Sequence, residues 1–195
     1  MKPPLRERER RGIPLRALIP NAVTALALCS GLTGIRFAIA ASQSGDPALW
    51  ERAAFFIIVA GVLDGMDGRI ARMLRGQSRF GAELDSLSDA IAFGVSPAII
   101  LYLWSLQAWA PYGWVFALAL AVCTALRLAR FNANIDVEEQ PHKSAGFLTG
   151  VPAPAGAGLA LLPVFLWLAT GEEIFREPAV VAPWAGFVAF LMISS

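Results

Sequence analysis

Long apolar segments alternate with short polar stretches along the whole chain, and each apolar segment predicts a helix. Most of them reach the roughly 20 residues that a helix needs to cross the hydrocarbon core of a bilayer. The final segment is short and the chain ends inside it, so we expect the last helix to be incomplete. The six predicted spans cover residues 16–41, 49–73, 83–107, 111–131, 149–170 and 180–195.

The composition supports a bilayer as the solvent of this chain. Hydrophobic residues make up 56% of the sequence, charged residues make up only 16%, and the mean hydropathy is +0.58. A soluble domain of similar size carries about 45–50% apolar and about 25% charged residues. The fold class that follows is an all-α membrane protein with six transmembrane helices. We expect a basic cytoplasmic arm over residues 1–15 and a single six-helix domain over residues 16–195.

Lysine and arginine are concentrated in alternate connections, which predicts how the helices are oriented. The connections on the other side hold only Arg176. By the positive-inside rule, both termini face the cytoplasm, and the membrane is the inner (cytoplasmic) one. A basic arm is also compatible with nucleic-acid binding, but the flank of a first membrane helix explains it better, and we expect no nucleic-acid partner. The basic residues are Lys2, Arg6, Arg8, Arg10, Arg11 and Arg16 in the arm, Arg69, Arg72, Arg75 and Arg79 in the next basic connection, and Arg127, Arg130 and Lys143 in the last.

Four aspartates interrupt two consecutive apolar segments, where an ionisable side chain is costly and is by default a functional hypothesis. Asp64 and Asp67 lie near the end of the second predicted helix, and Asp85 and Asp89 lie in the third. At about 100° per residue, the first pair shares one stripe of its helix, and the second pair, spaced i and i+4, shares one face. A short basic turn joins the two helices. An antiparallel hairpin therefore brings the four carboxylates together near the cytoplasmic surface.

Such a cluster needs protons or cations, because like charges repel strongly where the dielectric constant is low. Hard divalent cations meet this need, and we expect Mg²⁺ or Mn²⁺, with Ca²⁺ as a further option, in a polar cavity at the cytoplasmic side. The absence of a nearby Cys or His argues against zinc. Two ions among four carboxylates would clamp a diphosphate. Gly68, Ala71 and Gly81 leave room for a ligand, although small residues also serve helix packing, and Arg72 is the natural cation for a phosphate oxygen.

The spacing of these residues resembles the signature of the CDP-alcohol phosphotransferase family. The resemblance rests on eight fixed positions at fixed spacing, which is a specific signal. It implies a six-helix fold, a homodimer and a divalent-metal site that faces the cytoplasm. The matching string is Asp64-x-x-Asp67-Gly68-x-x-Ala71-Arg72, followed after eight residues by Gly81-x-x-x-Asp85-x-x-x-Asp89.

The resemblance also implies roles for individual residues. Asp89 matches the catalytic general base, with a share in the second metal. Asn21 and Thr24 look like a polar pair that approaches the nucleotide, although a helix-start cap after Pro20 is an alternative explanation. The metal-ligand positions are matched by Asp64, Asp67 and Asp85, and the positions lining the CDP moiety by Gly68, Ala71, Arg72 and Gly81.

Within the family, residues 80–98, 129–132 and 150–155 are similar to the small membrane-integral phosphatidylserine synthases. This similarity implies transfer of a phosphatidyl group from CDP-diacylglycerol to L-serine, with the acyl chains among the membrane lipids. Arg127 and Arg130 suit the serine carboxylate, because a guanidinium can hold a carboxylate through two bonds. Asn132 suits the amino group. Positive-inside charge explains the two arginines equally well.

Other functions fit part of the same pattern. Glycerol 3-phosphate or inositol phosphate could replace serine as the acceptor, because their phosphates also require arginines. A cation transporter is an alternative of a different class, since intramembrane carboxylates often mark ion paths. The transporter is the weaker interpretation, because all four acids cluster at one membrane face and no acid in the later helices continues a path.

Overall fold

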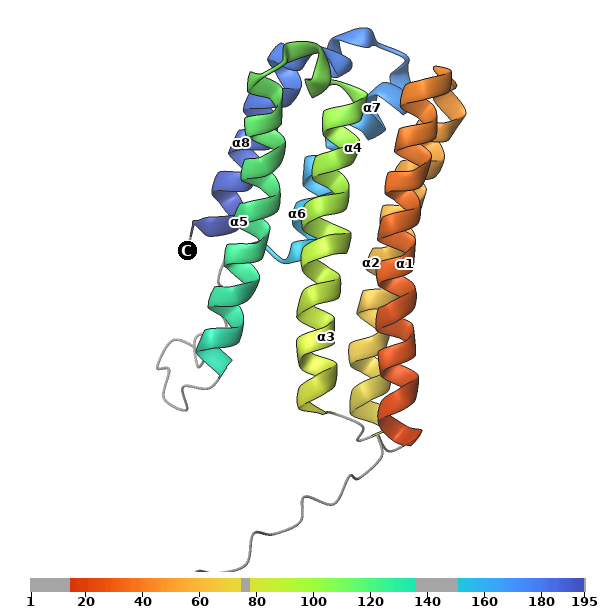
Figure 1. The fold of residues 1–195 in the computed structure, drawn as a ribbon, viewed down its shortest axis with the longest axis vertical. Coiled ribbons are helices and arrows are strands. Elements are labelled where there is room, and N and C mark those ends of the chain that lie inside the picture. Colours follow the sequence, from red (N-terminus) through yellow and green to blue (C-terminus); the bar gives the residue numbers. More distant parts are fainter. Residues whose placement is uncertain (1–14, 75–77, 136–150, 195) are drawn as a thin grey trace, which may run out of the picture.

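The computed structural model describes residues 15–74, 78–135 and 151–194, and every regular element within these ranges is a helix. The long helices run side by side along the longest axis of the molecule (Figure 1). The helices are α1 (Leu15–Ser44), α2 (Pro47–Met73), α3 (Arg79–Asp89), α4 (Ser96–Trp104), α5 (Tyr112–Ile135), α6 (Ala153–Ala160), α7 (Leu162–Thr170) and α8 (Pro178–Ile193).

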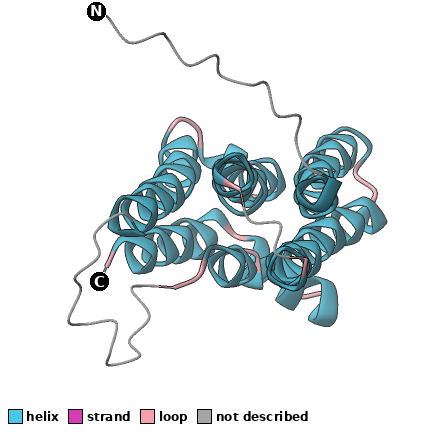
Figure 2. Cartoon of the chain, turned by 90° about the horizontal axis from the view of Figure 1, so that it is seen from below, coloured by secondary structure: helices cyan, strands magenta, loops and turns pink. Residues whose placement is uncertain are grey.

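Two helix pairs enclose a central rod. α1 and α2 form an antiparallel hairpin, α5 packs against α8, and the rod made by α3 and α4 lies between these pairs (Figure 1 and Figure 2). Gly45, with a φ of 72°, turns the chain between α1 and α2. The side chain of Asp46 then caps α2 by accepting a hydrogen bond from the amide of Ala48 at 2.9 Å. Ser78 caps α3 in the same way through the amide of Gly81, at 3.0 Å, and so starts α3 beside the end of α2.

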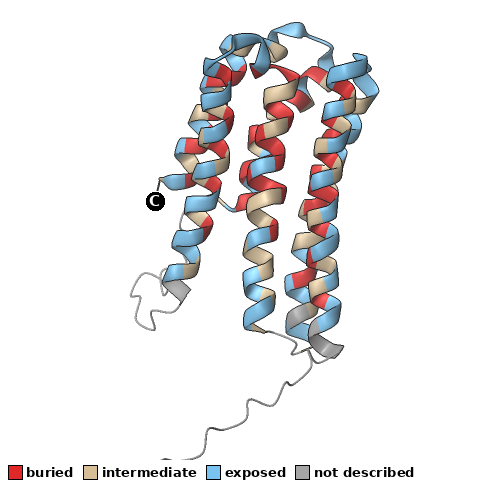
Figure 3. Ribbon diagram, in the orientation of Figure 1, coloured by how far each residue is buried: buried red, intermediate tan, exposed pale blue. Residues whose placement is uncertain are grey.

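Buried residues lie mainly on the sides of the helices that face the middle of the bundle, and exposed residues lie on its outside (Figure 3). Trp50, Phe93 and Trp104 are among the largest fully buried side chains. Large apolar residues such as Phe55 and Phe190 are exposed, which is the surface expected of a protein whose solvent is lipid. Buried residues become sparse towards the end of the bundle where α2 ends and α3 begins. This less tightly packed end carries the aspartates.

In the described ranges 15–74, 78–135 and 151–194, three helices are each long and apolar enough to cross a membrane, and the α6–α7 pair adds a fourth if its bent halves count as one span. α8 is apolar but has only 16 residues, and α2 has 27 residues but carries charged side chains near both ends. Within the described residues, the all-α class with membrane-spanning helices is therefore confirmed, whereas six spans are not. The three spans are Leu18–Ser44, Arg79–Trp104 and Tyr112–Ala133.

A proline distorts the central rod. The segment Ala90–Val95, between α3 and α4, is π-helical rather than α-helical. It ends just before Pro97, which has no N–H and whose ring would clash with the carbonyl oxygen of Phe93 in a regular α-helix. A wider turn avoids this clash, and single π-helical turns of this kind are frequent at functional sites. Here the π-helical turn directly follows Asp89.

A second proline breaks the predicted helix over residues 149–170 into α6 and α7, which are bent by 43° relative to each other. Pro163 lacks the N–H that would bond the carbonyl oxygen of Leu159. The indole N–H of Trp184, in α8, donates to that oxygen at 2.8 Å. A neighbouring helix thus satisfies the backbone group that the kink frees, as the lipid environment requires.

Arginines also lie at the end of the bundle away from the aspartates. Nε of Arg176 donates to the carbonyl oxygen of Trp104 at 3.0 Å, and its guanidinium lies 5.5 Å from the ring centroid of Trp167. Arg36 and Arg52 lie near this end on α1 and α2. The charge difference between the two ends is therefore smaller than the connections alone indicate, and the orientation stays a prediction. Residues 1–14, Arg75 and Lys143 lie outside the described residues.

Candidate functional site

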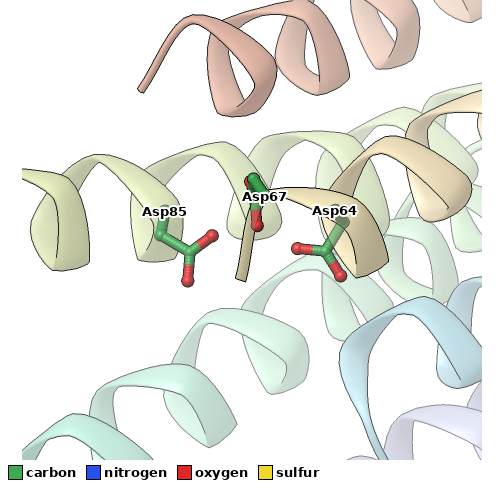
Figure 4. Close-up of side chains that lie close together, drawn as sticks. All are labelled: Asp64, Asp67 and Asp85. Atoms are coloured by element: carbon green, nitrogen blue, oxygen red, sulfur yellow. The ribbon is translucent and has the colours of Figure 1, made fainter. Parts of the chain in front are cut away.

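Three aspartates from two helices form a compact cluster. Asp64 and Asp67 lie towards the end of α2, and Asp85 lies in the neighbouring α3. One carboxylate oxygen from each residue lies within 4.8 Å of the others. Figure 4 shows the three carboxylates turned towards a common space. The two helix faces identified from the spacing thus meet, as a tight hairpin requires.

Asp89 adds a fourth carboxyl group to this cluster. It ends α3, one turn after Asp85. Its carboxyl group lies close to that of Asp64. Two carboxyl groups approach each other closely only with a proton between them or a cation in its place. The structure therefore brings together all four aspartates that the sequence pattern singles out.

The cluster has the donor chemistry of a divalent-cation site. Oδ1 of Asp85 is buried and accepts no hydrogen bond from the described residues. A buried carboxylate oxygen without a donor is costly, and a bound cation would remove that cost. All the ligand atoms are carboxylate oxygens, which Mg²⁺, Mn²⁺ and Ca²⁺ prefer. Asp64, Asp67 and Asp85 are thus the residues that could hold such an ion.

Thr24 links the cluster to α1. It is only 5% exposed, and its hydroxyl donates to Oδ2 of Asp67 at 2.7 Å. The carbonyl oxygen of Pro20 lies farther away, at 3.1 Å, and the charged carboxylate is the stronger acceptor. Ser88 of α3 donates to the main-chain carbonyl of Thr24 at 3.2 Å. Thr24 therefore holds one oxygen of Asp67 in place, a role that the nucleotide contact implied by the family resemblance does not include.

Thr24→Val is expected to weaken divalent-cation binding, because it removes the hydroxyl and keeps the shape of the side chain. Loss of such an outer partner lowers metal affinity roughly 10–100-fold, and we expect a loss in that range. Titration of the purified protein with Mn²⁺, with the free ion measured by EPR, gives the affinity. Thr33→Val is the matched control, because the Thr33 hydroxyl donates to the carbonyl of Cys29 within α1. Equal Mn²⁺ affinity in the two variants would rule out this role for Thr24.

The residues expected to line a nucleotide lie around the same end of the bundle. A β-carbon at Gly81 would lie 2.9 Å from Oδ1 of Asn21, so glycine lets the first turn of α3 approach α1. At Gly68 a β-carbon would meet no atom within 4 Å, which leaves room for a ligand, and Arg72 is exposed in the last turn of α2. The side chain of Ala71 lies outside the described part of the chain. Nucleotide contact by these residues stays a prediction.

A cavity of about 260 Å³ lies beside the cluster, between α3, α5 and the start of α6. Asp85 and Asp89 line it from α3, and Arg127 and Asn132 line it from α5. Nε of Arg127 is buried and has no hydrogen-bond partner in the part of the chain that the structure describes, and the guanidinium interacts electrostatically with Asp89. The cavity therefore combines a cation and an amide with two carboxyl groups.

The three residues expected to bind an acceptor do not all lie at one place in the structure. Arg127 and Asn132 share the cavity, whereas Nη1 of Arg130 donates to the carbonyl oxygen of Ile193, at the end of α8, at 3.1 Å. Ser86, which sequence reasoning missed, also lines the cavity and accepts a hydrogen bond from Nδ2 of Asn132 at 2.8 Å. A hydroxyl placed between two aspartates of a membrane helix was the signal that could have identified it.

Several known proteins are similar in sequence to this chain over most of its length. The chain is 43% identical over 187 residues to the CDP-diacylglycerol–serine O-phosphatidyltransferase of Mycobacterium bovis, which covers 96% of the chain and 62% of that relative. It is 34% identical over 174 residues to the Helicobacter pylori protein of the same name, which covers 89% of the chain and 67% of that relative. The match to the Saccharomyces cerevisiae protein of this name is 34% over 142 residues, 71% of the chain and 50% of the relative. The family model for CDP-alcohol phosphatidyltransferase matches residues 17–192, and the chain belongs to this family.

Proposed function

We propose that this chain transfers the phosphatidyl group of CDP-diacylglycerol to the hydroxyl of L-serine, which yields phosphatidylserine and CMP. The chain is an integral membrane protein by its apolar helices and its family. The chain spans 62% of the length of its mycobacterial relative. The activity named for that relative therefore supports the proposal, and the activity of this chain stays a proposal. The observation that carries the proposal is the cavity that joins Arg127 and Asn132 to the aspartate cluster.

The cavity offers a complementary group for each part of L-serine. The Arg127 guanidinium, whose Nε has no hydrogen-bond partner among the described residues, can hold the carboxylate. The amide oxygen of Asn132, which lines the same cavity, suits the ammonium group. Glycerol 3-phosphate and inositol phosphate have no ammonium group, so neither can donate a charged hydrogen bond to the Asn132 amide oxygen. The mixture of charges therefore favours an amino acid as the acceptor.

The aspartate cluster supplies the donor side of the reaction. Asp64, Asp67 and Asp85 would hold one divalent cation, Mg²⁺ or Mn²⁺, and Asp89 would help to hold a second. The family is generally dependent on divalent metals, and the chemistry that they supply when bound is neutralisation of diphosphate charge. The residues that we propose line the CDP moiety are Asn21, Thr24, Gly68, Ala71, Arg72 and Gly81.

Asp89 is the proposed general base. Its carboxylate accepts the proton of the serine hydroxyl, and the serine oxygen forms a bond to the phosphorus that carries diacylglycerol. The bond from this phosphorus to the oxygen of CMP breaks, and CMP leaves with the bonding electrons. Arg127 lies within electrostatic range of Asp89. A serine carboxylate held by Arg127 would thus bring the serine hydroxyl towards the base.

The proposed topology follows from the same site. Arg69, Arg72 and Arg79 flank the aspartate end of the bundle, which favours a cytoplasmic position for that end and for both termini. L-Serine and CMP then exchange with the cytoplasm, while the acyl chains lie against the apolar outer surface. We propose that the catalytic domain covers residues 16–195 and that it acts as a homodimer in the inner membrane.

The purified protein is expected to release CMP from CDP-diacylglycerol at least about tenfold faster with L-serine than with glycerol 3-phosphate or inositol phosphate. The reason is the ammonium group, since one charge-assisted hydrogen bond is worth about 1.5–3 kcal/mol. CMP release is measured in detergent with Mn²⁺ or Mg²⁺ at equal acceptor concentrations. No ion gradient exists in detergent, so turnover there also distinguishes an enzyme from a cation transporter. A preference for glycerol 3-phosphate would refute the serine proposal and leave the family membership intact.

A further inference from the structure

A hydrogen bond inside the cavity joins α3 to α5. Nδ2 of Asn132 donates to Oγ of Ser86 at 2.8 Å, and both side chains are half-buried and line the cavity. Ser86 directly follows Asp85 and lies three residues before Asp89. The bond therefore connects the helix that carries the proposed base to the helix that carries the proposed acceptor-binding residues.

The hydroxyl of Ser86 has a fixed direction. Its proton is donated to the main-chain carbonyl oxygen of Ala82, one turn earlier in α3, at 3.1 Å. A hydroxyl whose single proton is engaged can only accept from its other neighbours. Towards Asn132, Ser86 is thus an acceptor, and the amide must present its NH₂ group to it.

This contact determines which end of the Asn132 amide is left for a ligand. A rotated amide would place its oxygen against Oγ of Ser86, an acceptor against an acceptor, and would lose the bond. With the NH₂ group held by Ser86, the amide oxygen Oδ1 has no donor among the described residues. The amide therefore offers an acceptor to the cavity, which an ammonium group needs and a phosphate does not.

We propose that Ser86 is a positioning residue for the acceptor, which fixes the Asn132 amide so that its oxygen accepts a hydrogen bond from the ammonium group of L-serine. The inference rests on the proposed function and deepens it, because it assigns the discrimination between an amino acid and a phosphate-bearing alcohol to one pair of residues. A bond that only held α3 against α5 would affect both substrates and the stability of the fold alike. The two roles therefore differ in measurable ways.

Ser86→Ala is expected to raise the KM for L-serine roughly three- to tenfold, the effect of one neutral hydrogen bond. The KM for CDP-diacylglycerol and the Mn²⁺ concentration for half-maximal rate stay unchanged. Ser86→Thr keeps the hydroxyl and is expected to retain most of the serine affinity. Ser30→Ala is the matched control, because the Ser30 hydroxyl makes the same bond to a carbonyl one turn earlier, that of Leu26. This control is expected to leave both KM values at the wild-type level.

A double-mutant cycle tests whether Ser86 acts through Asn132. Asn132→Ala is expected to raise the KM for L-serine at least as much as Ser86→Ala, and the double variant is expected to match Asn132→Ala. Asn132→Ala also tests the contact from α5 if Ser86→Ala does not fold. Independent effects in the double variant, or an equal rise in both KM values, would overturn the inference while the serine reaction stands. A wild-type protein that does not use L-serine would overturn both.

Discussion

Asp85→Asn is expected to abolish CMP release and to remove tight Mn²⁺ binding. Asparagine has nearly the same shape as aspartate, but it replaces one carboxylate oxygen by an NH₂ group and removes the negative charge that attracts the cation. Oδ1 of Asp85 is buried without a donor from the described residues, and Asp85 supplies one of the three carboxylates of the cluster. A metal supplies several kcal/mol of transition-state stabilisation, which corresponds to a loss of roughly 10³-fold or more. Asp64→Asn and Asp67→Asn are expected to act in the same direction.

Glu83→Gln is the matched control for Asp85→Asn. It removes the same charge from an exposed side chain two residues earlier in α3 and is expected to change neither CMP release nor Mn²⁺ affinity. Both quantities are measured for each variant, and wild-type protein is assayed in excess chelator. Full wild-type turnover in chelator, or normal Mn²⁺ affinity of Asp85→Asn, would contradict the assignment of this cluster to a metal.

Asp89→Asn is expected to lower turnover by roughly 10²–10⁴-fold, the range for removal of a general base. The amide cannot accept the proton of the serine hydroxyl, whereas Asp64, Asp67 and Asp85 remain to hold a cation. Binding of CDP-diacylglycerol is therefore expected to fall much less than turnover. Equilibrium binding of the lipid and the rate of CMP release at saturating serine provide the comparison.

The outcome separates two roles of Asp89, which also contacts Asp64. A fall in lipid binding as large as the fall in turnover would show that Asp89 is mainly a ligand or a structural residue. A fall in turnover alone, with normal affinity for the Mn²⁺ ion that Asp64, Asp67 and Asp85 would hold, is the result expected of a base. Glu83→Gln serves again as the control for loss of a carboxylate from α3.

Local sequence patterns, namely apolar runs and the spacing of residues along a helix, were sufficient to predict the helices and the close approach of the four aspartates. Apolar runs identified each helical segment, although the ends differ by a few residues. α3, for example, begins at Arg79 rather than at residue 83. The spacing of Asp64 with Asp67, and of Asp85 with Asp89, follows the turn of a helix, and a short connection leaves the two helices few ways to pack. The family resemblance rests on the same local spacing.

The distortions at the prolines could not be predicted from local sequence patterns. Both prolines are visible in the sequence, but Pro97 follows a π-helical turn, whereas Pro163 lies at a bend of 43° between α6 and α7. In a lipid environment the result depends on how the freed carbonyl group is satisfied. For Leu159 the donor is Trp184, 25 residues away on another helix.

The sequence by itself determined the all-helical membrane class, the helix order and the four-carboxylate cluster, because each depends on periodicity and short connections. Only the tertiary structure decided that Thr24 holds Asp67, that Ser86 holds Asn132, and that Arg130 contacts the end of α8. Those partners lie 43, 46 and 63 residues apart in the chain. A hydrogen bond between two helices forms only if each helix has the right rotation about its axis and the right position along it. Contacts between residues that are distant in the sequence determine both the rotation and the position.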